Sequence, residues 1–166
     1  MARIWRFGED VNTDQIVPGR YAPYMTSEAE LPTFAFIEAR PEFAKTVQPG
    51  DIIVAGRNFG CGSSREYAPL ALKLNGLGAI IAPSFARIFF RNALNLGIPL
   101  FEADLTWLED GETVTLDRGQ GILTTSRGPI TLPPPPDWIR EVWEAGGIAS
   151  YIREHGHFPG QGAARA

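Results

Sequence analysis

The sequence predicts an α/β fold, with a parallel sheet flanked by helices and a lobe of short β-strands. Three short apolar runs are typical of buried strands, at residues 51–55, 79–82 and 97–101. Helix-like segments at 67–75 and from Ser84 onward separate these runs, which is the pattern of parallel strands joined by crossover helices. Alternating segments between 113 and 132, broken by glycine turns, predict the lobe.

The chain has 166 residues, enough for one domain, which we expect over 1–158 with a frayed tail over 159–166. A net charge of −4 gives no electrostatic footprint for nucleic acid. The start lacks a charged-then-apolar leader, and no apolar run is long enough to cross a membrane, so we expect a cytoplasmic protein. Cys61 is the single cysteine, which excludes an internal disulfide and a four-thiolate metal site.

The first quarter of the chain alternates between short elements and loops. Residues 3–7 predict a strand, and 8–14 a polar loop. Residues 15–18 are expected to be extended, because Pro18 disfavours a central strand. A loop over 19–25 then carries one cation and two phenols. These side chains either pack locally or bind a ligand; they are Arg20, Tyr21 and Tyr24.

Helical pieces are predicted over 27–40 and 41–46, each with a proline near its start. Ser84 is expected to cap the helix that follows the second buried strand. After the lobe, the prolines at 133–136 predict a stiff spacer, and Asp137 is expected to cap the next helix. Gly146-Gly147 interrupts that helix, which resumes over 148–154.

The most informative stretch is the turn at 56–66, Gly-Arg-Asn-Phe-Gly-Cys-Gly-Ser-Ser-Arg-Glu, between a buried strand and a helix. Such a turn directs backbone N–H groups and the positive end of the helix dipole at one spot, which favours an anion. Ser63 and Ser64 add hydroxyl donors, and Arg65 can hold a carboxylate with two parallel hydrogen bonds. The residues expected to support this turn are Gly60, Cys61 and Gly62.

Positive surroundings also lower the pKa of a serine, which could let Ser63 act as a base. The structural alternative is that Ser63 only caps the helix and Arg65 only pairs with a nearby carboxylate. The commoner functional turns are excluded. The dinucleotide fingerprint needs a small residue where Arg65 stands, the phosphate loop needs a lysine, and no histidine before His155 could serve a hydrolase serine.

Three segments carry a resemblance to a known family: the turn at 56–66, Ser-Phe-Ala-Arg-Ile at 84–88 and Asn-Thr-Asp-Gln-Ile at 12–16. In their order and spacing along the chain, these segments resemble the swivel domain of the aconitase superfamily, in particular the separate small subunits of 3-isopropylmalate dehydratase and homoaconitase. The resemblance covers about residues 3–158. It implies a swivelling β/β/α domain and a hydro-lyase subunit that is active only with a large subunit.

The resemblance also implies roles for residues and for a partner. Ser63 matches the catalytic base, Arg65 the arginine that binds a substrate carboxylate, and Ser64 a further carboxylate contact. Asp14 matches an acid with an organising role, and Arg87 an arginine with a structural one. The large subunit of this family carries a [4Fe–4S] cluster with one open iron, so no metal is expected on this chain, which would form a heterodimer or heterotetramer.

The substrate is left open between two acids. The reaction implied is the dehydration and rehydration of a malate-like acid, and the loop over 19–25 lies where relatives carry substrate-selecting residues. Arg20 could hold the third carboxylate of a tricarboxylic substrate, or a carboxylate that both substrates share. Isopropylmalate in leucine biosynthesis is the first expectation and homoaconitate in lysine biosynthesis the second. A non-catalytic carboxylate-binding module is the alternative from another class.

Overall fold

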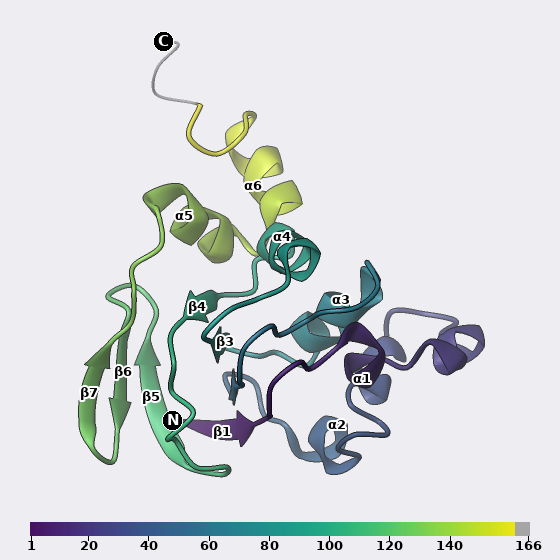
Figure 1. Ribbon diagram of the computed structural model, residues 1–166. Helices are drawn as coiled ribbons and strands as arrows, with labels where there is room; N and C mark the ends of the chain where they lie inside the picture. The colour runs from purple at the N-terminus through teal and green to yellow at the C-terminus, as the bar shows by residue number, and fades with distance from the viewer. Residues whose placement is uncertain (162–166) are drawn as a thin grey trace.

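A computed structural model describes residues 1–161 and shows one seven-stranded sheet with helices around it (Figure 1). The strand order is β4-β3-β2-β1-β5-β6-β7. The strands are β1 (Ala2–Arg6), β2 (Ile52–Val54), β3 (Ala79–Ala82), β4 (Leu100–Glu102), β5 (Thr113–Asp117), β6 (Ile122–Thr125) and β7 (Gly128–Thr131). The helices are α1 (Thr13–Ile16), η1 (Gly19–Tyr24), η2 (Leu31–Phe34), α2 (Glu42–Thr46), α3 (Tyr67–Leu74), α4 (Arg87–Asn95), α5 (Asp137–Ala145) and α6 (Ile148–His155), where η marks a 3-10 helix.

The expected fold class is confirmed. Strands β1 to β4 are parallel, with Ile53 opposite Trp5 on one side and Ile80 on the other. Strands β5 to β7 form the antiparallel lobe. The lobe continues the same sheet, because Ala2 of β1 pairs antiparallel with Val114 of β5. In Figure 1 the lobe lies on the left of β1, and helices α1 to α3 lie on the right.

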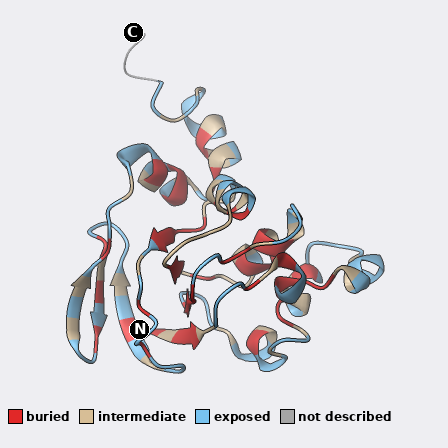
Figure 2. Cartoon of the chain, in the orientation of Figure 1, coloured by how far each residue is buried: buried red, intermediate tan, exposed pale blue. Residues whose placement is uncertain are grey.

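Each face of the parallel sheet has its own hydrophobic core, because successive side chains of a strand point to opposite faces. Ile53 and Ile80 pack with α3, α2 and η2 on one face. Ile52 and Ile81 pack with the lobe and α5 on the other. All four side chains are fully buried, as expected for strands covered on both faces (Figure 2).

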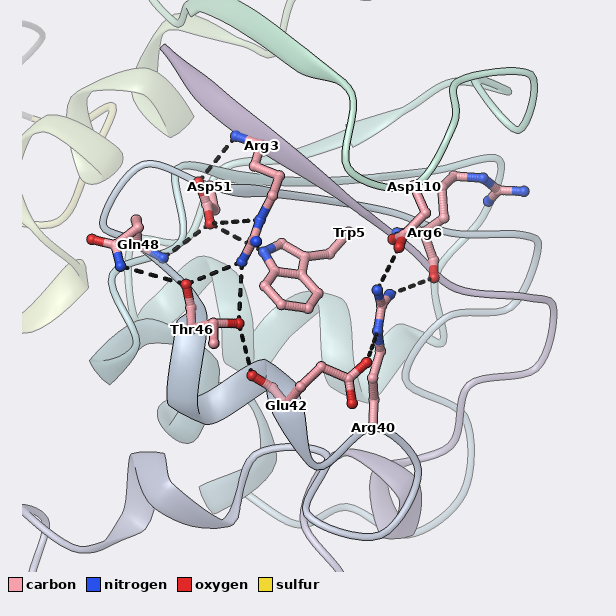
Figure 3. A network of polar contacts seen from close by, with 9 residues as sticks. All are labelled: Arg3, Trp5, Arg6, Arg40, Glu42, Thr46, Gln48, Asp51 and Asp110. Atoms are coloured by element: carbon pink, nitrogen blue, oxygen red, sulfur yellow. Dashed lines mark hydrogen bonds and ion pairs between the residues drawn. The ribbon is translucent and has the colours of Figure 1, made fainter.

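A buried carboxylate fastens the start of β2 to β1 (Figure 3). Asp51 is 3% exposed and accepts three hydrogen bonds: from the backbone N–H of Arg3 at 3.0 Å, the indole N–H of Trp5 at 3.1 Å and the backbone N–H of Gln48 at 2.9 Å. Nearby, the Arg40 guanidinium lies 4.6 Å from the Trp5 ring centre. This network holds β1 and β2 in register and so supports the loops that follow them.

Some local predictions are wrong, and hydrogen bonding explains two of them, those for residues 13–16 and for Ser84. Residues 13–16 are helical because the side chain of Asn12 accepts from the N–H of Gln15, whose side chain accepts from Asn12 in return. The loop at 19–25 contains the 3-10 helix η1. Ser84 does not cap α4, because its hydroxyl accepts from the N–H of Asn58 at 2.8 Å. Helix α5 starts at Asp137 itself, with Pro136 at the cap.

The remaining expectations concern the ends of the chain and the membrane. Helix α6 follows Gly146-Gly147, as predicted, and Gly146 has the left-handed conformation with φ +86°. Most of the tail expected over 159–166 lies outside the described residues, which end at Gln161. Over residues 1–161, none of the helices is long and apolar enough to cross a bilayer.

Candidate active site

Three loops meet at the carboxyl edge of the parallel sheet. The residues after β1, β2 and β3 are the three segments singled out in the sequence, and these strands are neighbours. Backbone bridges join Asn12 to Cys61 and Phe59 to Phe85. The N–H of Gly60 also donates to the carbonyl of Val11 at 2.7 Å. The turn at 56–66 therefore lies between the other two loops, at the edge where open α/β sheets bind ligands.

Glycines allow the turn to pass close to its neighbours. Gly60 has φ +84°, and a Cβ there would lie 2.2 Å from the Phe89 side chain. Gly62 has φ +102°, and a Cβ there would lie 3.3 Å from the Thr13 hydroxyl oxygen. Between them, the carbonyl of Cys61 accepts the N–H of Thr13 at 2.8 Å. Gly60, Cys61 and Gly62 thus lie close to neighbouring segments, and their supporting role stays a prediction.

The two serines stand at the open end of this turn. Both Ser63 and Ser64 are exposed, and their backbone N–H groups make no hydrogen bond within residues 1–161. The Ser63 hydroxyl oxygen lies 3.3 Å from that of Thr13. Helix α3 begins at Tyr67 with Glu66 as its cap residue, so Ser63 is not the helix cap. Free N–H groups and hydroxyls together suit an anionic oxygen.

Arg65 is oriented by a carboxylate from the first loop. Its Nη1 donates to Oδ1 of Asp14 at 2.9 Å, and the same oxygen accepts the N–H of Gly19 at 2.9 Å. The Gly19 N–H and the Arg65 guanidinium hold the pKa of Asp14 below its usual value. A Cβ at Gly19 would lie 2.4 Å from the Arg65 guanidinium, so the start of η1 rests against Arg65. The organising role expected for Asp14 stays a prediction.

The residues of η1 are less closely tied to the turn. Arg20 forms an ion pair with Glu38, and its guanidinium lies 5.3 Å from the Tyr21 ring centre. The Tyr21 ring packs against Phe34, with ring centres 5.5 Å apart. Tyr24 is 66% exposed. Arg20 and Tyr21 thus pack locally in this structure, and the substrate-binding role of the three side chains stays a prediction.

Two further observations complete the site. Arg87 is exposed at the first residue of α4, and its side chain makes no hydrogen bond or ion pair within the described chain, so its structural role stays a prediction. Thr13, by contrast, is a buried polar residue beside Ser63 that the sequence analysis did not single out. The signal that could have found it is the pair Asn12 and Gln15, whose spacing predicts a capped helix starting at Thr13.

The fold and the site define a small α/β protein whose exposed serine hydroxyls and anchored arginine face solvent at the ligand-binding edge of a parallel sheet. The model of the aconitase C-terminal domain matches residues 11–102, which include all three loops.

Individual relatives agree over almost the whole chain. The 3-isopropylmalate dehydratase small subunit 1 of Deinococcus radiodurans is 58% identical, over 97% of this chain and 92% of its own length. The homoaconitase small subunit of Thermus thermophilus is 53% identical, over 97% of this chain and 100% of its own length. A crystal structure of 3-isopropylmalate dehydratase from Methanocaldococcus jannaschii is 40% identical with a TM-score of 0.85, covering 93% of each chain. The chain therefore belongs to the aconitase C-terminal domain family, among the small subunits of 3-isopropylmalate dehydratase and homoaconitase.

Proposed function

We propose that this chain is the small subunit of a 3-isopropylmalate dehydratase, a hydro-lyase that interconverts 2-isopropylmalate and 3-isopropylmalate by dehydration and rehydration in leucine biosynthesis. The observation that carries the proposal is the turn at 56–66, where the exposed Ser63 and Ser64 are followed by the partly exposed Arg65. The Deinococcus relative, similar along nearly its full length, supports the choice of substrate.

The residues of the turn divide the work between binding and proton transfer. The Arg65 fork and the free N–H groups of Ser63 and Ser64 suit a substrate carboxylate. The deprotonated Ser63 oxygen then takes the proton from the carbon next to that carboxylate, and the neutral hydroxyl formed in this step returns the proton during rehydration. The anchored cation nearby stabilises negative charge on the Ser63 oxygen, which favours its role as the base.

The other half of this active site is proposed to come from a large subunit. Within residues 1–161, no three His, Cys, Asp or Glu side chains gather where they could hold a metal ion. The cluster expected on the partner would supply a Lewis acid for the departing hydroxyl. The exposure of Ser63 and Ser64 leaves them accessible to a partner surface. The expected cytoplasmic location stays a prediction.

The homoaconitase small subunit is the second candidate, favoured by the Thermus relative and by the cation of the η1 loop. In this structure Arg20 is paired with Glu38, so it would have to exchange partners to bind a third carboxylate. The isopropylmalate assignment needs no such exchange, and we therefore place it first.

The test is to reconstitute the chain with its cluster-loaded large subunit and to measure turnover of 2-isopropylmalate, 3-isopropylmalate and homoaconitate side by side. We expect turnover of the isopropylmalates only in the reconstituted complex, and none with either subunit alone. Turnover of homoaconitate without turnover of the isopropylmalates would overturn the first assignment in favour of the second. A complex inactive on all three acids would favour a carboxylate-binding module.

A further inference from the structure

Thr13 is a buried polar residue whose hydroxyl group joins the first loop to the turn at 56–66. It is 3% exposed, and the described chain has two other buried polar residues, Asp51 and Thr125. Asp51 accepts three hydrogen bonds from two segments, and Thr125 closes the turn between β6 and β7 by donating to Gly128 and accepting from Arg127. Within residues 1–161, the hydroxyl of Thr13 hydrogen bonds only to atoms of Ser63.

The geometry allows the hydroxyl hydrogen of Thr13 to point to either of two oxygen atoms of Ser63. A threonine hydroxyl has one hydrogen to donate and lone pairs to accept. The Thr13 oxygen lies 3.0 Å from the Ser63 carbonyl oxygen, which can only accept, and 3.3 Å from the Ser63 hydroxyl oxygen. While Ser63 is neutral, Thr13 donates to the carbonyl and accepts from the Ser63 hydroxyl. When the Ser63 oxygen is negatively charged, rotation about the Cβ–Oγ1 bond of Thr13 moves the same hydrogen onto it.

Backbone contacts hold the Thr13 hydroxyl in place for this exchange. The Thr13 N–H donates to the Cys61 carbonyl at 2.8 Å, and the Thr13 carbonyl accepts from Val17 at 2.9 Å. The absence of a side chain at Gly62 leaves room for the hydroxyl, since a Cβ there would be 3.3 Å away. The capping interactions of Asn12 fix the first turn of α1, so Thr13 cannot move away from Ser63 without breaking that turn.

We propose that Thr13 is a positioning residue for Ser63: it orients the neutral hydroxyl and donates its hydrogen to the oxygen once Ser63 has lost its proton. This inference rests on the proposed function, in which Ser63 is the base. A hydrogen bond to a charged oxygen is roughly twice as strong as one between neutral groups. Thr13 therefore stabilises the deprotonated form of Ser63 more than the protonated form, and favours the base at lower pH.

The test uses the reconstituted complex with Thr13→Val, which keeps the shape and removes the hydroxyl, and Thr13→Ser, which keeps the hydroxyl. We expect Thr13→Val to lower kcat about 10- to 100-fold, with KM changed less than about threefold, because a hydrogen bond to a charged group is lost. The limb on which kcat rises with pH should move to higher pH. Thr13→Ser should restore kcat to within about threefold of the wild type and return the limb to its original position.

A matched control is Thr125→Val, which removes the hydroxyl of the other buried threonine, in the turn between β6 and β7. It should lower the melting temperature and leave the pH profile unmoved. An unmoved pH limb in Thr13→Val, or an equal loss in Thr13→Val and Thr13→Ser, would overturn the inference.

A double-mutant comparison separates this inference from the proposed function. If Thr13 acts through Ser63, adding Thr13→Val to Ser63→Ala should not lower the residual rate further. A further loss would show that Thr13 acts by another route. If Ser63→Ala itself keeps full turnover, the proposed base is wrong. If the Thr13→Val subunit does not assemble with the large subunit, Thr13→Ala is the second variant without the hydroxyl. The inference would be contradicted if neither variant assembles while Thr13→Ser assembles and shows a shifted pH limb of kcat.

Discussion

Replacing Asp14 by asparagine should separate the stability of the fold from the geometry of the site. An asparagine keeps a side-chain oxygen that can accept the N–H of Gly19, so the start of η1 should stay in place. The same change removes the negative charge that holds the Arg65 guanidinium at 2.9 Å. The variant therefore alters the anchoring of one cation and little else.

The exposure of the two side chains sets the expected loss of stability. The side chains of Asp14 and Arg65 are 65% and 32% exposed, so solvent screens the ion pair, and its loss should cost no more than about 1 kcal/mol of stability. For a chain of this size that corresponds to a melting-temperature decrease of about 2–4 °C at most. The effect on catalysis should be larger, because the Arg65 guanidinium would no longer be held where it binds the carboxylate. We expect kcat/KM to fall about 10- to 100-fold.

The assay is turnover of isopropylmalate by the reconstituted complex, together with thermal unfolding of the subunit. Asp104→Asn is the matched control, because Asp104 also accepts from a backbone N–H, that of Thr106, but forms no ion pair within residues 1–161. It should leave kcat/KM unchanged. An unchanged or raised kcat/KM in Asp14→Asn would refute the anchoring role, and a large loss of stability would show that the pair supports the fold.

The pH dependence of this pair has a definite sign. The folded pKa of Asp14 lies below its ordinary value, because the carboxylate accepts from Gly19 and from Arg65. Its contribution to stability is therefore complete above the unfolded pKa of about 3.9 and is lost as the pH falls through the lower folded value. The stability difference between wild type and Asp14→Asn should be constant above about pH 5 and shrink in acid, as followed by unfolding at several pH values. A difference that grows in acid would contradict this cause.

Three other substitutions have distinct expected results. Asp51→Ala leaves the Trp5 indole N–H and two backbone N–H groups without their acceptor, which should cost about 3 kcal/mol and lower the melting temperature by about 6–12 °C, whereas Asp51→Asn should cost less. Gly60→Ala should destabilise by at least about 2 kcal/mol in chemical unfolding, since φ is +84° and the Phe89 side chain occupies the space; an unchanged midpoint would refute the close approach. Arg65→Lys should reduce kcat/KM about 100-fold with unfolding unchanged, because a lysine cannot reproduce the planar fork; wild-type kinetics would show that a point charge suffices.

The fold class could be predicted from the sequence, and the meeting of the three loops follows from it once β1 is placed parallel to β2. Short apolar runs separated by helix-like segments imply parallel strands, and the carboxyl ends of parallel strands share one edge. The segments at 12–16, 56–66 and 84–88 each follow such a strand, so their proximity was implied once the strands were assigned. The strand pairs of the lobe were visible as alternation broken by glycine turns.

The local geometry of the site was harder to predict. The helix α1 was missed because Gln15 to Pro18 reads as extended, while the capping box formed by Asn12 and Gln15 determines the conformation. Ser84 looked like a helix cap, but tertiary contact gave its hydroxyl to Asn58. The contact between Thr13 and Ser63 joins residues 50 positions apart, and local sequence patterns carry no information about it.

The central claim is that Ser63 is the base of an active site that a second subunit completes. The most direct test is the turnover of isopropylmalate by the reconstituted complex carrying Ser63→Ala, with Ser150→Ala on α6 as a control at a distant serine. We expect Ser63→Ala to lose several orders of magnitude in kcat while complex formation is retained, and Ser150→Ala to match the wild type. Full turnover by an assembled Ser63→Ala complex would contradict the claim and leave the turn as a carboxylate-binding element alone.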